Sequence, residues 1–122
     1  MITPEQFAEL VARYESDRIE FTVSTTNMDK FSEAVCAFSN DLADTKQNGF
    51  LFVGVDDKGV PAGLKVTDEL MRNLASIRCE GNVLPSPAMT VQKLVLPEGE
   101  VAVVEVKPSQ FTPVRYKGYR TL

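Results

Sequence analysis

The stretch that decides the fold is Asn48-Gly49-Phe50-Leu51-Phe52-Val53-Gly54-Val55-Asp56-Asp57-Lys58-Gly59. From Phe50 to Val55 it is apolar on both faces, which predicts a central strand covered on both sides of a sheet. The strand ends in two adjacent carboxylates and a turn bounded by glycine. Asp56 and Asp57 therefore have two readings: they simply end the strand, or they belong to a site at its mouth.

Helix and strand patterns extend outward from this strand in both directions. The expected elements are a helix from Thr3, a half-buried strand at 18–23, a helix at about 28–43, a helix after Thr67, a hairpin of strands at 90–96 and 101–106, and a last edge strand at 114–119. The order α-β-α-β-α-β-β predicts an α/β (α+β) fold. Its core would be a mixed sheet of about four strands, packed by two to three helices.

The chain length of 122 residues predicts a single domain, 1–122, large enough to bury a core without disulfides. There is no interdomain linker or internal repeat. The last predicted strand has barely begun when the sequence stops. We therefore expect the chain to be the N-terminal fragment of a longer protein.

The composition excludes several kinds of chemistry. The chain has no histidine and two cysteines, so Ser-His-Asp and Cys-His hydrolases and zinc sites are not supported. No cofactor is required, and any metal would be Mg²⁺ or Mn²⁺ on oxygen ligands. From the sequence we expect neither a membrane span nor a signal peptide. Cys36 and Cys79 lie in helix-like patterns and are expected to be buried and reduced, which favours a cytoplasmic location.

Charge is divided unevenly along the sequence. All 17 acidic residues lie before Lys107, whereas the last 16 residues carry four basic residues and no acid. Basic side chains beside aromatic rings suit phosphate contacts and base stacking. The candidate nucleic-acid-binding residues are Lys107, Arg115, Tyr116, Lys117 and Arg120. The alternative is an ordinary edge strand guarded by Lys and Arg, with Tyr packing.

A second candidate site consists of carboxylates. Glu15, Glu20, Asp56 and Asp57 would approach one rim of the sheet if the first two strands are neighbours. Such a set can hold Mg²⁺ or Mn²⁺ and activate a water for phosphodiester cleavage. The alternative is that Asp56 and Asp57 form a turn and Glu20 is solvated. The glycines form no phosphate-binding loop motif.

Five segments together resemble one family. They are Glu15-Ser16-x-x-Ile19-Glu20-Phe21, Val35 to Asn40, Gly49 to Gly59, Val106-Lys107-Pro108-Ser109, and Pro113 to Gly118. In this order they are similar to the Schlafen/Alba-type domain, also called AlbA_2 or divergent AAA-4. The resemblance spans roughly residues 13–120.

The resemblance implies a nucleic-acid-binding α/β domain of predicted bacterial and archaeal transcriptional regulators. It also implies a three-carboxylate nuclease site in related eukaryotic domains, which would map onto Glu15, Glu20 and Asp57. This chain has Thr22 where the family commonly has lysine, which argues against catalysis. Its Asn40–Gly49 connection is also longer than the family's short glycine turn.

These observations lead to three hypotheses. The first is a nucleic-acid-binding domain of a transcriptional regulator, with DNA favoured over RNA as the ligand. Under this hypothesis the chain is not an enzyme. The second is a metal-dependent endoribonuclease of the Schlafen type. The third is a dimerisation module without affinity for nucleic acid, because Schlafen cores pair two such lobes. A homodimer is expected in any case.

Overall fold

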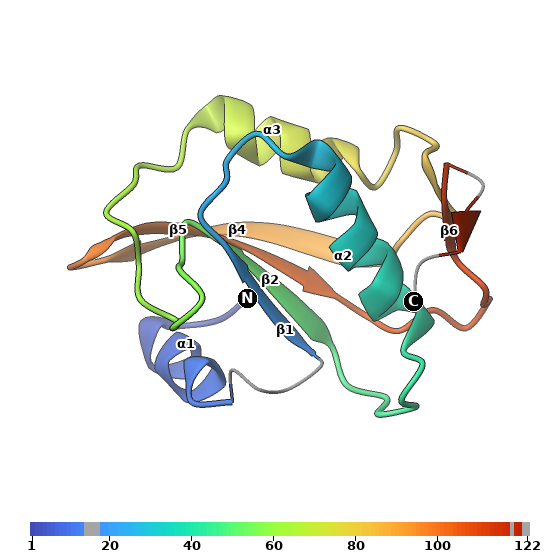
Figure 1. The fold of residues 1–122 in the computed structure, drawn as a ribbon, viewed down its shortest axis with the longest axis horizontal. Helices are drawn as coiled ribbons and strands as arrows, with labels where there is room; N and C mark the ends of the chain where they lie inside the picture. Colours follow the sequence, from blue (N-terminus) through green and yellow to red (C-terminus); the bar gives the residue numbers. More distant parts are fainter. Residues whose placement is uncertain (14–17, 118, 121–122) are drawn as a thin grey trace.

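The centre of the fold is a four-stranded mixed sheet with the strand order β1-β2-β5-β4 (Figure 1). A computed structural model describes residues 1–13, 18–117 and 119–120. The strands are β1 (Ile19–Thr22), β2 (Gly49–Val53), β4 (Met89–Leu96) and β5 (Gly99–Val106). β1 runs parallel to β2, and the other pairs are antiparallel. The predicted fold class is confirmed, and the first two strands, whose adjacency the sequence left open, are neighbours.

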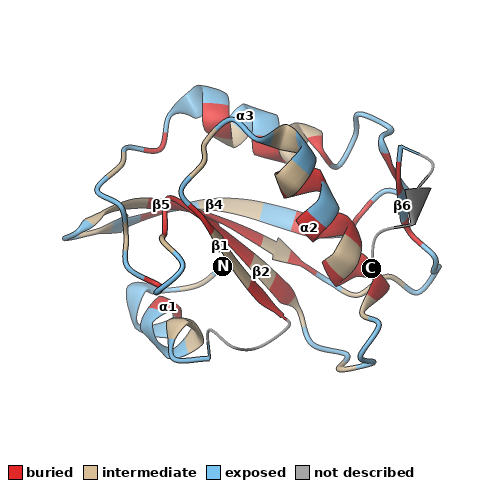
Figure 2. Ribbon diagram, in the orientation of Figure 1, coloured by how far each residue is buried: buried red, intermediate tan, exposed pale blue. Residues whose placement is uncertain are grey.

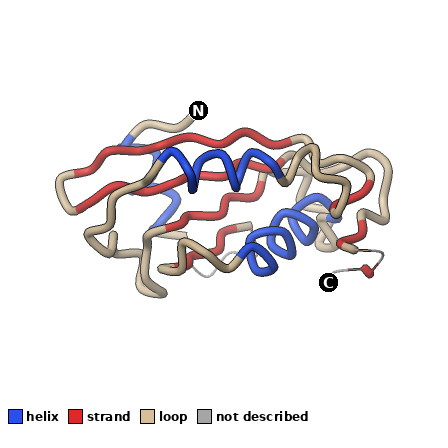
Figure 3. The backbone as a smooth tube through the Cα atoms, turned by 90° about the horizontal axis from the view of Figure 1, so that it is seen from above, coloured by secondary structure: helices blue, strands red, loops and turns tan. Residues whose placement is uncertain are grey.

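Helices cover both faces of this sheet, as the two-sided apolar pattern of β2 predicts (Figures 1 and 3). α2 (Met28–Asn40) and α3 (Asp68–Ser76) pack on one face, and α1 (Pro4–Val11) packs on the other. Leu51 and Val53 join the α2 and α3 side, whereas Phe52 joins Phe7 of α1 on the opposite side. The alternation along β2 therefore places its side chains in two cores, one on each face of the sheet. Figure 2 shows buried residues in red along the central strands.

The helix starts follow the capping residues in the sequence. Thr3 and Gln6 form the predicted capping box of α1. Asn27 caps α2 by accepting a hydrogen bond from the Lys30 amide, and Thr67 caps α3 in the same way. No helix among the described residues is long and apolar enough to cross a membrane.

β1 is half-buried as predicted, but burial does not follow the predicted faces: Ile19 and Thr22 are buried, and Glu20 and Phe21 are half-buried. Its polar face is covered by α2, so Thr22 is buried, and the side chain of the preceding Arg18 is buried as well. Alternation of polar and apolar residues cannot show the burial of Arg18, because the carbonyls that accept from its guanidinium lie 20 and 29 residues further along the chain. Cys36 is buried as expected, but Cys79 lies beyond the end of α3 and is exposed.

The predicted edge strand at 114–119 is also different in the structure. It consists of two short strands, β6 (Arg115–Tyr116) and β7 (Tyr119–Arg120), between which the chain reverses. β6 also pairs with β3 (Val83–Leu84), so that a second sheet of order β3-β6-β7 stands beside α2 (Figure 1). Two-residue strands have no periodicity that a sequence pattern could reveal.

Candidate nucleic-acid interface

The basic C-terminal segment begins where β5 ends and is fastened to the rest of the domain by its backbone. The amide of Lys107 donates to the carbonyl of Ala88 at 2.9 Å, and the amide of Ser109 donates to the carbonyl of Ser39 at 2.8 Å. Ser39 lies in the last turn of α2. The segment is therefore placed against the C-terminal end of α2.

Asn40 fixes the segment a few residues further on. Its side-chain Oδ1 accepts from the Val114 amide at 2.7 Å, and its Nδ2 donates to the Val114 carbonyl at 2.9 Å. The Cys36 thiol, one turn earlier, also donates to that carbonyl at 3.1 Å. Val114 is fully buried. The side chain of Asn40 thus supplies the partners that a strand neighbour would otherwise supply to this buried backbone.

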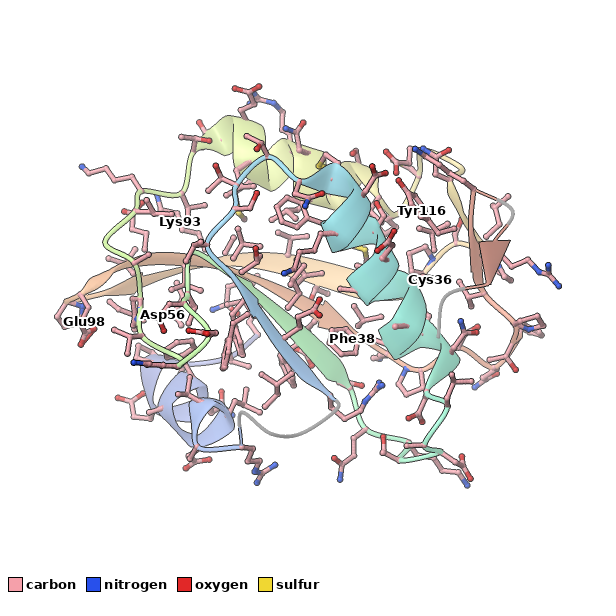
Figure 4. The ribbon with its side chains drawn as sticks, in the orientation of Figure 1. Cys36, Phe38, Asp56, Lys93, Glu98 and Tyr116 are labelled. Atoms are coloured by element: carbon pink, nitrogen blue, oxygen red, sulfur yellow. The ribbon has the colours of Figure 1, made fainter. Side chains whose placement is uncertain are left out.

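Tyr116 closes the segment onto the other end of α2 (Figure 4). Its phenol donates a short hydrogen bond to Oδ1 of Asp29, which lies in the first turn of α2. The Lys117 ammonium lies 3.3 Å from the same oxygen and 5.2 Å from the centre of the Tyr116 ring. Of the stacking and packing roles open to Tyr116, its 9% exposure favours packing.

These contacts shift the pKa values of both partners. Hydrogen bonds from Tyr116 and then Lys117 lower the pKa of Asp29, while the bond to Asp29, followed by desolvation, raises the pKa of Tyr116. The Asp29 contribution to stability is present above the ordinary pKa of aspartate and is lost as pH falls through the lowered value. The Tyr116 contribution is present below the ordinary tyrosine pKa and is lost as pH rises through the raised value.

We therefore expect Tyr116 to ionise at a pH above the ordinary range for tyrosine, because the raised pKa is set by its bond to Asp29. An alkaline titration followed by tyrosinate absorbance measures this directly. The late component should disappear in Tyr116→Phe and move to lower pH in Asp29→Asn, because the carboxylate that holds the phenolic proton is then absent. A titration of the unmodified chain that Tyr116→Phe leaves without any change at high pH would contradict the expectation.

The remaining basic residues of the segment differ in how far they are committed to other contacts. Lys107 and Arg115 are exposed. Lys117 is exposed but faces Asp29. Arg120 occupies the β7 position paired with Arg115, and its side chain lies outside the described part of the chain. Lys107 and Arg115 thus expose their side chains to solvent, whereas the Lys117 ammonium already has an acidic partner in Asp29.

The carboxylate candidates lie elsewhere in the fold. Asp56 is at the end of the domain near α1, far from Tyr116 (Figure 4). Its Oδ1 accepts from the amides of Lys58 and Val60, at 2.9 and 3.0 Å. Gly59 completes this turn with φ +82°, and a Cβ there would lie 2.5 Å from Val11 of α1. Asp56 therefore shapes a turn, and Asp57 is exposed beside it.

Glu20 lies on the α2 side of the sheet, because it is paired with Leu51 of β2. It lines a groove with Lys30 and Glu33 of α2. Burial raises the pKa of the Glu20 carboxyl, Lys30 opposes this shift, and Glu33 adds to it. A half-buried carboxyl with a raised pKa is a reasonable component of a site but does not define one.

The predicted metal site is not assembled by the residues in view. Within 1–13, 18–117 and 119–120, no three Asp, Glu, Cys or His side chains are grouped so as to hold a metal ion. Glu15 lies outside the described residues. The set of Glu15, Glu20 and Asp57, with or without Asp56, therefore stays a prediction, as does catalysis by it.

Comparison with known proteins identifies the family. Residues 15–121 match the family described as Schlafen, AlbA_2. The chain belongs to this family. The AlbA_2 domain is also similar to a solution NMR structure from Nitrosomonas europaea, the N-terminal domain of a protein described as related to an ATP-dependent DNA helicase, RecG. The two are 27% identical with a TM-score of 0.68, over 100% of this chain and 90% of that one.

A second similar structure is more distant. The DIP2311 protein from Corynebacterium diphtheriae is 15% identical, with a TM-score of 0.48, over 93% of this chain and 24% of that one. No curated protein matches the AlbA_2 domain. The family and the fold are therefore the firm results of these comparisons.

Sequence reasoning overlooked three residues that matter at this end of the domain. Asn40 and Asp29 hold the C-terminal segment from positions 74 and 87 residues away in the chain, and no local pattern reports such pairs. Phe111, in contrast, could have been identified from the sequence as an exposed aromatic residue. A large apolar residue in the polar, proline-bounded loop 108–113 has no strand or helix face to occupy, and its side chain is indeed 74% exposed.

Proposed function

We propose that this AlbA_2 domain binds nucleic acid through the basic residues of its C-terminal segment and serves as the nucleic-acid-binding part of a DNA-acting protein such as a transcriptional regulator. The observation that carries the proposal is the exposure of Lys107 and Arg115 on a segment that contains no acidic residue from Lys107 onward. Phosphate contacts need fixed, accessible cations, and nearby carboxylates would repel the backbone.

Anchoring of the segment supports this assignment. Asn40 holds it at Val114, and Tyr116 holds it at Asp29. Arg115 lies between these two anchors. Its backbone is therefore fixed before any ligand arrives, so that less conformational entropy is lost on binding. The helicase description belongs to the similar protein from Nitrosomonas europaea. It agrees with a role on DNA and does not by itself assign one.

The proposal predicts a salt-dependent interaction that the basic residues control. Arg115→Ala together with Lys117→Ala should weaken binding to every nucleic-acid sequence and flatten the salt slope by about 2 units, because two phosphate contacts are lost. Arg115→Ala alone should account for the larger part, since Lys117 is already neutralised in part by Asp29. Fluorescence anisotropy with labelled oligonucleotides at several salt concentrations measures both.

The matched control is Lys58→Ala with Lys65→Ala. It removes the same charge from exposed positions in the connection between β2 and α3, at the end of the sheet away from β6 (Figure 1). Equal losses in the two double variants would mean that net charge, and not this interface, governs binding. The titrations are made in EDTA and repeated with Mn²⁺. Cleavage that requires Mn²⁺ and is lost in Glu20→Ala would favour the nuclease hypothesis instead.

A further inference from the structure

A groove of about 740 Å³ runs beside the basic segment, between two stretches of irregular chain. One side is the connection from α2 to β2, including Leu42 and Lys46, and the other is the connection from β5 to β6, including Lys107, Gln110 and Thr112. Phe111 lies between the last two of these in the sequence and is not itself a lining residue. We call this groove the 42–112 groove.

Phe111 is the exposed one among the aromatic side chains that the structure places. Its exposure is 74%, whereas the aromatic residues of α1, α2, β2 and β6 are buried or half-buried. Neither hydrophobic core includes it. An aromatic ring in this position contributes nothing to the packing of the fold, and it is available for contact with a ligand.

The loop that carries Phe111 is nevertheless fixed. The Ser109 hydroxyl accepts a hydrogen bond from the Phe111 amide at 3.0 Å. The Ser109 amide is held by the carbonyl of Ser39, and Val114 is held by Asn40. The loop is therefore tied to α2 on both sides of the ring. A ring displayed from a fixed loop loses little freedom when it stacks on a partner.

The charges around the groove favour an anion. Lys46 and Lys107 both line it. The carboxylate of Asp41 is turned to internal contacts: it accepts from the Lys46 amide at 2.8 Å and the Thr45 hydroxyl at 2.9 Å, and lies 3.7 Å from the Arg18 guanidinium. Among the described residues that line the groove, Asp44 is then the one acidic residue whose side chain is exposed to solvent.

We propose that a single strand of nucleic acid runs along the 42–112 groove, with phosphates on Lys46 and Lys107 and one base stacked on the exposed Phe111 of the bordering loop. This inference rests on the proposed function and specifies its ligand. Stacking on a side chain requires an unpaired base with an open face, whereas a duplex presents mainly phosphates and groove edges. Positive charge beside an exposed ring is the usual combination for strands bound without sequence preference.

The chain contains no tryptophan, which allows a direct test. Phe111→Trp introduces a single tryptophan that keeps the stacking surface. Its fluorescence should be quenched by short oligothymidylate or oligouridylate, and the quenching should saturate with binding. Phe111→Ala should weaken binding to these strands about tenfold or more, the size expected for loss of one stacked base. Lys46→Ala with Lys107→Ala should weaken binding and flatten its salt slope.

Two controls isolate the stacking contribution. Val60 is an exposed apolar residue in the connection between β2 and α3. Val60→Trp should show no quenching, and Val60→Ala should bind like the unmodified chain. An abasic strand of equal length offers the same phosphates without bases. It should leave the fluorescence of Phe111→Trp unchanged and should bind equally well to Phe111→Ala and to the unmodified chain.

The results separate this inference from the proposed function. If the unmodified chain binds strands and duplex equally, and Phe111→Ala changes neither, the groove is not a stacking site although the domain still binds nucleic acid. If the unmodified chain binds no nucleic acid at low salt, both proposals are wrong. An exposed Phe111 would then be left as a contact for another protein.

Discussion

Replacing Arg18 with methionine will lower the free energy of unfolding by about 3–5 kcal/mol. Its guanidinium is buried and donates to the carbonyl of Phe38 at 3.0 Å and to that of Gln47 at 2.8 Å. It also lies 3.7 Å from Asp41 and 5.2 Å from the centre of the Phe38 ring. Methionine fills much of the space but leaves these acceptors without their donor.

The backbone partners make this case different from ion pairs that tolerate apolar replacement. In a buried ion pair both side chains can be exchanged for hydrophobic residues. The backbone carbonyls of Phe38 and Gln47, in contrast, cannot be removed by substitution. Urea denaturation measures the effect. Arg72→Met on α3 is the control, since Arg72 is exposed, and its change should stay within about 0.5 kcal/mol. A similarly small change in the free energy of unfolding for Arg18→Met would mean that the hydrogen bonds of Arg18 do not stabilise the fold.

Replacing Asn40 with alanine will destabilise the domain by about 2–4 kcal/mol, because the buried amide of Val114 loses its acceptor and the Val114 carbonyl keeps only the weak thiol donor of Cys36. The Val114 amide should also exchange with deuterium much faster, and the affinity for single strands should fall. The expected loss of affinity follows from the freed position of Phe111, which lies three residues before Val114.

Ser39→Ala is the matched control for this variant. Ser39 is as buried as Asn40, but its hydroxyl bonds only within α2, to the carbonyl of Val35 at 2.8 Å. A hydroxyl that bonds back to its own helix stabilises little, so the change should be under about 1 kcal/mol. Equal destabilisation by the two variants would mean that side-chain volume, and not the bonds to Val114, accounts for the loss.

The central part of the fold could be predicted because its signals are local. Phe50 to Val53 is apolar on both faces since helices cover both sides of β2. Thr3, Asn27 and Thr67 begin helices because their side chains accept hydrogen bonds from amides three residues further on. Each of these signals depends on residues that are close together in the sequence.

The candidate site was harder to predict because its contacts are long-range. The basic segment was recognisable by its charge, but its course depends on pairs such as Tyr116 with Asp29. A strand of two residues, such as β6, gives no alternation to detect. Likewise, the polar residues of β1 looked solvent-facing because nothing near them in the sequence indicates that α2 covers them.

The second sheet has a consequence for how the domain is synthesised. The C-terminal segment packs against α2, although Val114 of this segment lies 74 residues after its partner Asn40 in the sequence. At ribosomal rates of about 5–20 residues per second, Val114 is synthesised roughly 4–15 s after Asn40. Throughout this interval Val114, to which Cys36 and Asn40 bond in the folded domain, has not yet been synthesised. The nascent chain therefore passes through a stage in which the first strands and α2 are complete and the future binding segment is still absent. A chaperone that recognises the uncovered side of α2 would act in that interval.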